Sequence, residues 1–170
     1  MNILILNGSP HPNGNTAALI NAFTEGAESR NHKVTMIPVA LKNISGCKAC
    51  EYCHNNGKGN CIQQDDMQEV YKALEQTDLL VFASPVYYWS WSGQLQNTVS
   101  RFYPYGPVKV KKCALFLTSA SADVYDAPIS QYHSMLKYFG AENVGIYTSH
   151  GEQNKSEEIM EEVRNFGASL

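Results

Sequence analysis

The chain lacks any apolar run long enough to cross a membrane, and it lacks a charge excess of one sign. Its first apolar stretch, residues 3–6, is far shorter than the roughly 20 residues of a membrane span, and no basic segment precedes it as in a signal peptide. The net charge is only −3, and the longest basic group is Lys109, Lys111 and Lys112. Such a short group fits a solvated strand edge better than a nucleic-acid surface. We therefore expect a soluble cytoplasmic protein that acts neither on nucleic acid nor at a membrane.

Several well-known chemical motifs are missing as well. No Gly-Lys-Ser/Thr follows the first strand, which excludes an NTP-hydrolysing P-loop, and no G-x-G-x-x-G dinucleotide fingerprint is present. The histidines and carboxylates show no spacing typical of a Ser-His-Asp triad or of a catalytic carboxylate pair. For this reason, we assign no catalytic side chain.

Short apolar runs alternate with helical patterns along the whole chain. The runs at residues 3–6, 34–39, 79–83, 114–117 and 144–147 predict five strands. Helical patterns alternate with them, including residues 92–102 and 129–139, and a final helical pattern at residues 156–166 follows the last strand. Strands without polar alternation, separated by helices, indicate a parallel sheet that is covered on both faces. A length of 170 residues with 44% apolar residues suits one domain. The predicted fold class is α/β, a flavodoxin-like doubly wound sheet of five parallel strands in the order 2-1-3-4-5.

Local signals refine this picture. Asp66 and Glu69 have the spacing of a capping box at a helix start. Ser84-Pro85 is expected to end the third strand. Trp91, next to a helix start, and Cys113, at the start of a strand, are interpreted as core residues, whereas the cluster Phe102-Tyr103-Pro104-Tyr105 looks like a partner surface.

The loop after the first strand has the composition of a phosphate-binding loop. It is rich in glycine and small polar residues and leads directly into a helix: Gly8-Ser9-Pro10-His11-Pro12-Asn13-Gly14-Asn15-Thr16. Glycines allow close backbone approach, and a helix N-terminus offers N–H donors to a dianion. An ordinary strand-to-helix loop would have a similar composition, so this alternative stays open.

This loop, together with Ser84-Pro85-Val86-Tyr87-Tyr88 after the third strand and the cysteine segment ending at Asp65-Asp66-Met67, resembles the NAD(P)H-dependent FMN reductases. These flavodoxin-like oxidoreductases include the iron–sulfur flavoproteins, and the resemblance covers nearly the whole chain. It implies a single FMN-binding domain over residues 1–170, an NAD(P)H electron donor and a homodimer. It also implies three groups of cofactor-binding residues: Ser9, Pro10, Asn13, Asn15, Thr16 and Ala17 at the phosphate; Pro85, Val86, Tyr87, Tyr88 and Trp89 beside the ring; and Thr118, Ser119 and Ala120 at its other edge.

Four of the five cysteines fall in residues 40–64, a segment with little apolar pattern that is long for a structureless connection. Cys47, Cys50, Cys53 and Cys61 have the spacing C-x2-C-x2-C-x7-C. Three thiolates at this spacing can converge on one centre, although the bacterial ferredoxin run has a shorter last gap. The compact motif of the iron–sulfur flavoproteins resembles this spacing more closely. A [4Fe–4S] cluster, a structural zinc site and free thiols remain the three interpretations.

Two main hypotheses for function follow. The first is an FMN-dependent oxidoreductase that passes hydride from NAD(P)H through FMN to a quinone, a flavin, a metal ion or a redox protein. The second is an iron–sulfur flavoprotein that carries electrons between partner proteins. A non-catalytic nucleotide-binding module with the same fold is a third reading.

Overall fold

A computed structural model describes residues 1–170, and its centre is a parallel β-sheet. The strand order is β2-β1-β3-β5-β6, and every neighbouring pair in this series is parallel. The bounds are β1 Asn2–Asn7, β2 Lys33–Ile37, β3 Leu79–Tyr87, β5 Lys112–Ser119 and β6 Glu142–His150. Counted among themselves, these five strands have the order 2-1-3-4-5, so the predicted flavodoxin-like topology is confirmed.

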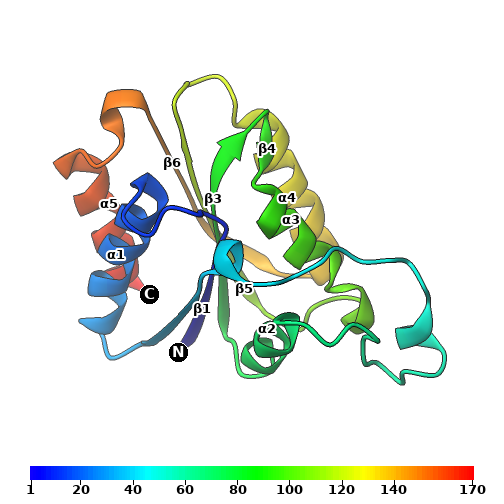
Figure 1. Ribbon diagram of the computed structural model, residues 1–170. Helices are drawn as coiled ribbons and strands as arrows, with labels where there is room; N and C mark the ends of the chain where they lie inside the picture. The colour runs from blue at the N-terminus through cyan, green and yellow to red at the C-terminus, as the bar shows by residue number, and fades with distance from the viewer.

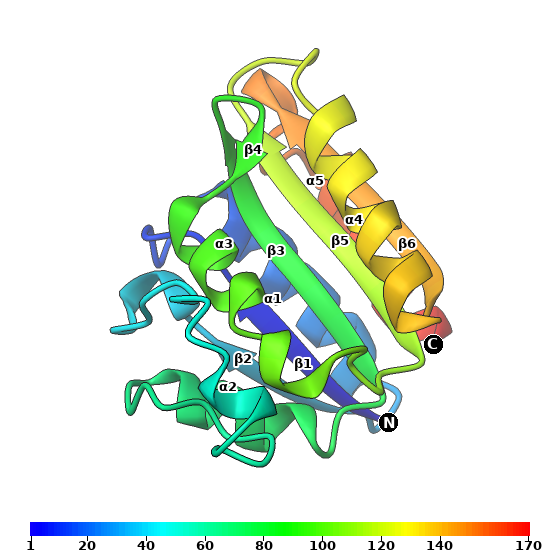
Figure 2. The ribbon, with the colours of Figure 1, turned by 90° about the vertical axis from the view of Figure 1, so that its right-hand side faces the viewer.

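The chain has five α-helices, and they cover the two faces of this sheet (Figure 1). Helices α1 and α5 lie on one face, and α2, α3 and α4 lie on the other, as the view in Figure 2 also shows. Their bounds are α1 Asn15–Glu28, α2 Met67–Leu74, α3 Gly93–Ser100, α4 Asp126–Phe139 and α5 Glu157–Ser169. None of them is long and apolar enough to cross a bilayer.

Two apolar cores result from the alternation of side chains along each strand. In β1, Ile3 and Ile5 face α1 and α5, where they join a core that includes Phe23 and Phe116. Leu4 and Leu6 point the other way, into the core under α2, α3 and α4. All four β1 side chains are almost fully buried. Burial on both faces explains why this strand reads as one continuous apolar run.

The third strand is longer than expected. The prediction that Ser84-Pro85 ends it is wrong, because β3 continues to Tyr87 and Pro85 pairs in register with Thr118 of β5. Pairing with β1 stops at Ala83, so Pro85 lies where one side of β3 is an edge. The missing N–H of a proline is tolerated there. Beyond it, the chain turns back into β4, Ser90–Trp91, an antiparallel strand that the sequence did not predict.

The predicted capping box at α2 is also wrong. Asp66 itself has helical dihedral angles, and its side chain makes no cap bond to the helix. Instead its carboxylate accepts a hydrogen bond from the Asn43 N–H at 2.7 Å. The Glu69 carboxylate forms an ion pair with Lys42. Both acidic side chains therefore bind the segment that follows β2 to the start of α2. These contacts join parts of the chain that are distant in sequence, so local spacing does not predict them.

Of the single residues whose burial was predicted, two are confirmed and one prediction is wrong. Trp91 is 2% exposed and stacks on Phe82, and Cys113 is fully buried, so both are confirmed as core residues. Phe102 is also buried, which contradicts its assignment to a partner surface. Tyr103 and Tyr105 of the same cluster remain exposed.

Candidate functional site

The loop between β1 and α1 is held in shape by hydrogen bonds from its backbone N–H groups to β3 and to nearby side chains. Gly8 N–H donates to the Ala83 carbonyl of β3 at 2.8 Å. Ser9 N–H donates to the Asn7 side-chain oxygen at 2.9 Å, and His11 N–H donates to the Ser9 hydroxyl at 3.3 Å. The loop thus begins at the carboxyl edge of the sheet, which is the edge where open α/β sheets bind ligands.

Helix α1 begins without a side-chain cap. Gly14 occupies the N-cap position and offers no capping oxygen, and the helical bonds start with Ala18 N–H donating to the Gly14 carbonyl at 3.1 Å. The N–H groups of Asn15, Thr16 and Ala17 precede this first bond and so have no partner within the helix. A Cβ on Gly14 would lie 2.9 Å from the His11 Cβ. The start of α1 therefore presents three backbone N–H groups without helical partners, a donor set that suits an anion.

Gly8 lets this loop pack directly on α3. A Cβ at this position would lie 2.6 Å from the Ser92 hydroxyl oxygen and 2.8 Å from the Leu95 Cβ. The Ser92 hydroxyl also caps α3 by accepting a hydrogen bond from Leu95 N–H. The β1–α1 loop, residues 8–14, and the start of α3 are consequently in contact, with no room for a larger residue at Gly8.

A side-chain bond joins the phosphate loop to β5. The hydroxyls of Thr16 and Thr118 lie 2.8 Å apart, and both residues are buried. Thr118 is also in register with Pro85 of β3. The structure thus brings one residue from each of the three predicted groups to the same edge of the sheet.

The predicted ring-stacking residues form an exposed hairpin tip between β3 and β4. Tyr88 is 96% exposed, and Tyr87 and Trp89 are about half exposed. Tyr88 and Trp89 have φ angles of 48° and 58°, a left-handed conformation that is rare for bulky residues and typical of strained functional segments. Trp89 Nε1–H donates to the Asp123 carbonyl at 3.3 Å, which connects the tip to the loop after β5. Val86, by contrast, is paired with Trp91 in the hairpin stem.

The loop after β5 is fixed by a small polar network. The Ser119 and Tyr125 hydroxyls lie 2.7 Å apart, and Tyr125 donates to the Ser149 carbonyl at the end of β6. Burial raises the pKa of Tyr125, although its bond with Ser119 opposes the shift. The tyrosine hydroxyl remains protonated and holds Ser119 beside β6. Ala120, one residue further on, is exposed.

One cation reaches the phosphate loop from a segment that the sequence did not single out. Lys155 lies between β6 and α5, and its ammonium group donates to the Asn13 carbonyl at 2.9 Å. A lone lysine in a polar turn carries no sequence signal, because its role depends on which loop lies next to it in space.

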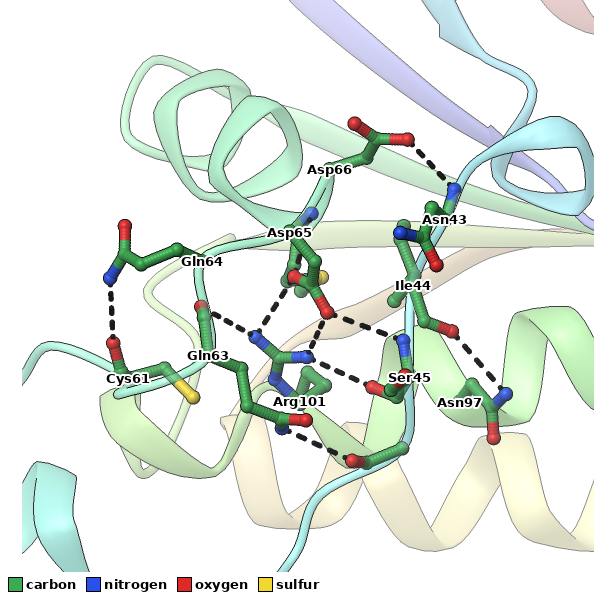
Figure 3. A network of polar contacts seen from close by, with 12 residues as sticks. Asn43, Ile44, Ser45, Cys61, Gln63, Gln64, Asp65, Asp66, Asn97 and Arg101 are labelled. Atoms are coloured by element: carbon green, nitrogen blue, oxygen red, sulfur yellow. Dashed lines mark hydrogen bonds and ion pairs between the residues drawn. The ribbon is translucent and has the colours of Figure 1, made fainter.

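The cysteine segment is a separate loop with a closed stem (Figure 3). Asp66 N–H donates to the Asn43 carbonyl, and Ser45 N–H donates to the Asp65 carboxylate at 3.3 Å. Arg101, which follows α3 and is 1% exposed, lies between the two sides of the stem. Its guanidinium donates to Asp65 at 2.7 and 3.1 Å and to the Ser45 carbonyl at 2.9 Å. Residues 46–62 therefore leave and rejoin the domain at one point.

The Arg101–Asp65 pair is held by hydrogen bonds as well as by charge. Burial alone would raise the pKa of Asp65, but the bonds from Arg101 and from the N–H groups of Ser45 and Met67 outweigh it and lower the pKa. Burial likewise opposes the charged form of Arg101, yet Asp65 and Tyr71 together raise its pKa. Both partners stay ionised in the neutral range.

The remainder of the loop wraps around the end of α3. Cys47 N–H donates to the Ser100 hydroxyl at 3.0 Å. The Tyr103 hydroxyl donates to the Glu51 carboxylate at 2.9 Å. The rings of Tyr103 and His54 pack edge to face, with their centroids 4.6 Å apart. The 40–64 segment therefore has defined contacts despite its lack of helices and strands other than two short 3-10 turns.

All four clustered cysteines line one small pocket, which Arg101 and Tyr103 also border. Cys53 is buried, and burial, with a smaller contribution from the thiols of Cys61 and Cys47, raises its pKa. No three of these side chains are grouped so that they could hold a single metal ion. Buried Arg101 Nε–H has no hydrogen-bond partner, and Figure 3 shows the Cys61 sulfur turned toward Arg101. Four thiols at one pocket supply the donor type that iron–sulfur clusters use.

Sequence reasoning missed Asp65 and Arg101 as the residues that shape this loop. Arg101 directly follows the end of α3. A single arginine at this place belongs to no sequence motif that would mark it as functional. Its burial follows only from the position of α3 over the sheet.

Comparison with known proteins agrees with this architecture. The model of the NADPH-dependent FMN reductase family matches residues 1–155. An iron–sulfur flavoprotein of Archaeoglobus fulgidus is 29% identical over 147 residues, which cover 85% of this chain and 66% of the relative. An iron–sulfur flavoprotein of Methanocaldococcus jannaschii is 31% identical over 104 residues, which cover 61% of this chain and 53% of the relative. The chain thus spans about half to two thirds of the length of these relatives.

Solved structures share the fold at lower identity. An NAD(P)H:quinone oxidoreductase from Methanothermobacter marburgensis superposes with a TM-score of 0.78 at 17% identity, covering 99% of this chain and 93% of the other. An azoreductase from Bacillus anthracis superposes with a TM-score of 0.71 at 18% identity, with full coverage of both chains.

Proposed function

Because the chain belongs to the NADPH-dependent FMN reductase family, we propose that it is an FMN-dependent oxidoreductase that takes hydride from NAD(P)H and passes electrons to a second acceptor. The observation that carries this proposal is the meeting of residues from all three predicted groups at one sheet edge, where Thr16 and Thr118 are hydrogen-bonded and Pro85 pairs with Thr118. A quinone, a flavin, a metal ion or a redox protein would serve as acceptor.

FMN, when bound, supplies the hydride-accepting chemistry, so the protein needs to supply binding, orientation and electrostatics. The N–H groups at the start of α1 and the hydroxyls of Ser9 and Thr16 would hold the phosphate. Tyr87, Tyr88 and Trp89 would stack beside the ring and exclude water, which adds about 0.5–1.5 kcal/mol per well-placed aromatic pair beyond burial. Backbone groups of Thr118, Ser119 and Ala120 would border the other edge and offer donors to developing negative charge.

The direct test is anaerobic reduction of the FMN-loaded protein by NADPH and by NADH, followed through loss of the visible flavin absorbance. Rapid loss with either donor supports the reductase, and the ratio of the two rates identifies the preferred donor. Protein that binds FMN but is not reduced by either nucleotide would contradict the proposal. Protein without any flavin affinity would favour a nucleotide-binding module that reuses the fold.

A second candidate function is electron transfer through a [4Fe–4S] cluster on Cys47, Cys50, Cys53 and Cys61. Two observations favour it: the four thiols line a common pocket, and Arg101, which also borders this pocket, has a buried Nε–H without a partner. Hydrogen bonds to sulfur are one of the levers by which a protein sets the potential of such a cluster. The chain would then carry single electrons between partner proteins.

Iron and acid-labile sulfide analysis after anaerobic purification tests this candidate. Cys61→Ser should lower the iron content, whereas Cys113→Ser, which changes the buried cysteine of β5, provides the matched control. Iron near zero in wild-type protein would contradict the cluster and leave the reductase proposal intact.

The same proposal includes a homodimer of single-domain chains, in which the second chain packs against the exposed hairpin tip and completes the flavin site beside it. Its support is the exposure of Tyr88 and Trp89, which are large aromatic side chains on the domain surface. Light scattering coupled to size-exclusion chromatography measures the mass directly. A monomer with full FMN affinity would contradict this part of the proposal.

A further inference from the structure

Lys155 reaches the phosphate loop across a large separation in sequence. It follows a short 3-10 turn at Gly151–Gln153 and precedes α5, and its φ angle is 66°. Its ammonium group donates to the carbonyl of Asn13, the residue immediately before the N-cap of α1, at 2.9 Å. The lysine therefore places a positive charge beside the start of α1.

The backbone next to this lysine is anchored at the same sheet edge. The Asn154 side-chain amide donates to the Ser119 carbonyl at 2.8 Å, and its oxygen accepts from the Ser149 hydroxyl at 2.7 Å. Asn154 thus ties the segment to β5 and β6, while Lys155 ties it to the phosphate loop. Lys155 is itself exposed, so its anchored backbone and its single bond to Asn13 are what place the ammonium group beside the loop.

The charge of Lys155 is also uncompensated. The three ion pairs of the chain involve Lys42, Arg101 and Arg164, and none involves Lys155. Residues 8–17 contain no aspartate, glutamate, lysine or arginine. The acidic neighbours of Lys155 in sequence, Glu152, Glu157 and Glu158, make no ion pair with it. One carbonyl occupies one of its three N–H donors, so the others can bind an anion at the loop.

We propose that Lys155 binds the FMN phosphate and makes the site select FMN over riboflavin. The inference rests on the proposed FMN function and adds a residue and a specificity to it. Backbone N–H groups alone offer dipoles to a dianion, whereas an ammonium group adds a full charge and a charge-assisted hydrogen bond. Because riboflavin has the same ring and ribityl chain without the phosphate, this contribution should appear with FMN alone.

The test is titration of the flavin-free protein with FMN and, separately, with riboflavin, followed by quenching of flavin fluorescence. Lys155→Met removes the charge at nearly constant length, and Lys155→Arg keeps the charge. Lys137→Met, an exposed lysine of α4, is the matched control. We expect Lys155→Met to weaken FMN binding about tenfold and to leave riboflavin binding unchanged, with Lys155→Arg close to wild type. Added salt should weaken FMN binding to wild type more than to Lys155→Met.

Unchanged FMN affinity in Lys155→Met would overturn the inference. An equal loss for FMN and riboflavin would also overturn it, because it would show that Lys155 only holds the loop in place. Wild-type protein that binds neither flavin would refute the FMN function itself, and this outcome is distinct from the other two because it needs no variant.

Discussion

The hydroxyl oxygens of Thr16 and Thr118 lie 2.8 Å apart, although 102 residues separate them in sequence. Thr16 is in the first turn of α1, and Thr118 is near the carboxyl end of β5. Both are almost fully buried. The bond therefore fixes the distance between the proposed phosphate loop and the proposed ring-binding strand, the two parts of the site that one flavin would have to span.

Thr118→Val tests this bond. The change removes one partner and leaves the buried Thr16 hydroxyl unpaired, which should lower the free energy of unfolding by about 1–3 kcal/mol and weaken FMN binding. Urea unfolding and FMN titration measure the two effects. The double variant Thr16→Val/Thr118→Val should lose less than the sum of the single variants. Thr35→Val, at an exposed position of β2, is the control, and an equal effect there would refute the explanation.

Gly8→Ala tests the contact between the phosphate loop and α3. The new Cβ would lie 2.6 Å from the Ser92 hydroxyl oxygen, so the start of α3 or the loop has to shift. We expect a loss of about 1–3 kcal/mol in the free energy of unfolding, together with weaker FMN binding. Gly93→Ala is the control, because a Cβ there meets nothing within 4 Å. If Gly8→Ala binds FMN as well as wild type does, the loop tolerates the shift and the proposed phosphate site does not depend on this contact.

Tyr88→Gly separates stability from function at the hairpin tip. Tyr88 has a φ of 48° and is 96% exposed, so its replacement relieves backbone strain and gives up almost no burial. The free energy of unfolding should rise by about 1 kcal/mol, and FMN affinity should fall because a stacking ring is lost. The exposed α4 variant Tyr138→Ala should not change FMN affinity. Unaltered FMN binding in Tyr88→Gly would remove Tyr88 from the proposed flavin environment.

Arg101→Met tests the stem of the cysteine loop. The change leaves the Asp65 carboxylate, whose side chain is 12% exposed, without its cation, and we expect a loss of about 3–5 kcal/mol in the free energy of unfolding. Arg164→Met breaks the exposed pair with Glu25 and should cost no more than about 1 kcal/mol. Adding Asp65→Asn to Arg101→Met should restore part of the loss. Similar losses for Arg101→Met and Arg164→Met in chemical denaturation would contradict the role of the buried pair.

The same pair predicts how stability depends on pH. The pKa of Asp65 is lowered in the folded protein, so its contribution is fully present above the unfolded value of about 3.9. That contribution is lost as the pH falls through the lower, folded pKa. The difference in unfolding free energy between wild type and Asp65→Asn should therefore be constant near neutral pH and shrink below about pH 4. Glu25→Gln provides the exposed comparison. If the difference in unfolding free energy instead grows on acidification, the pKa of Asp65 is not lowered in the folded protein and the prediction is wrong.

The sequence predicts the sheet well because each buried strand is a short apolar run between helical patterns. Residues 3–6 and 114–117 fall inside β1 and β5, and their order along the chain leads to the observed topology. Local signals that depend on a single neighbour fail more often. Asp66 and Glu69 have capping-box spacing, but partners from residues 42 and 43 compete for both carboxylates. Pro85 fails to end β3 because its missing N–H lies where pairing with β1 has already stopped.

The candidate site also has a part that the sequence predicts and a part that it does not. Its loops could be predicted because each of them follows a strand that ends at the same edge. The residues that connect the loops could not, since the bonds of Thr16 with Thr118 and of Lys155 with Asn13 join segments that are more than one hundred residues apart. Arg101 was missed for the related reason that its partners, Ser45 and Asp65, are brought to it by the stem.

The closed stem has a consequence for how this domain can change over evolutionary time. Because residues 43–45 and 63–66 are held side by side by Asp66, Asp65 and Arg101, the chain enters and leaves the cysteine loop at a single place. Loops attached in this way tolerate insertion, deletion and exchange, since the chain on either side keeps its path. The loop that would carry the proposed cluster can therefore be gained or lost in one genetic event, with changes confined to the loop and its contacts at Ser100 and Tyr103 and none in the strands at the proposed flavin site.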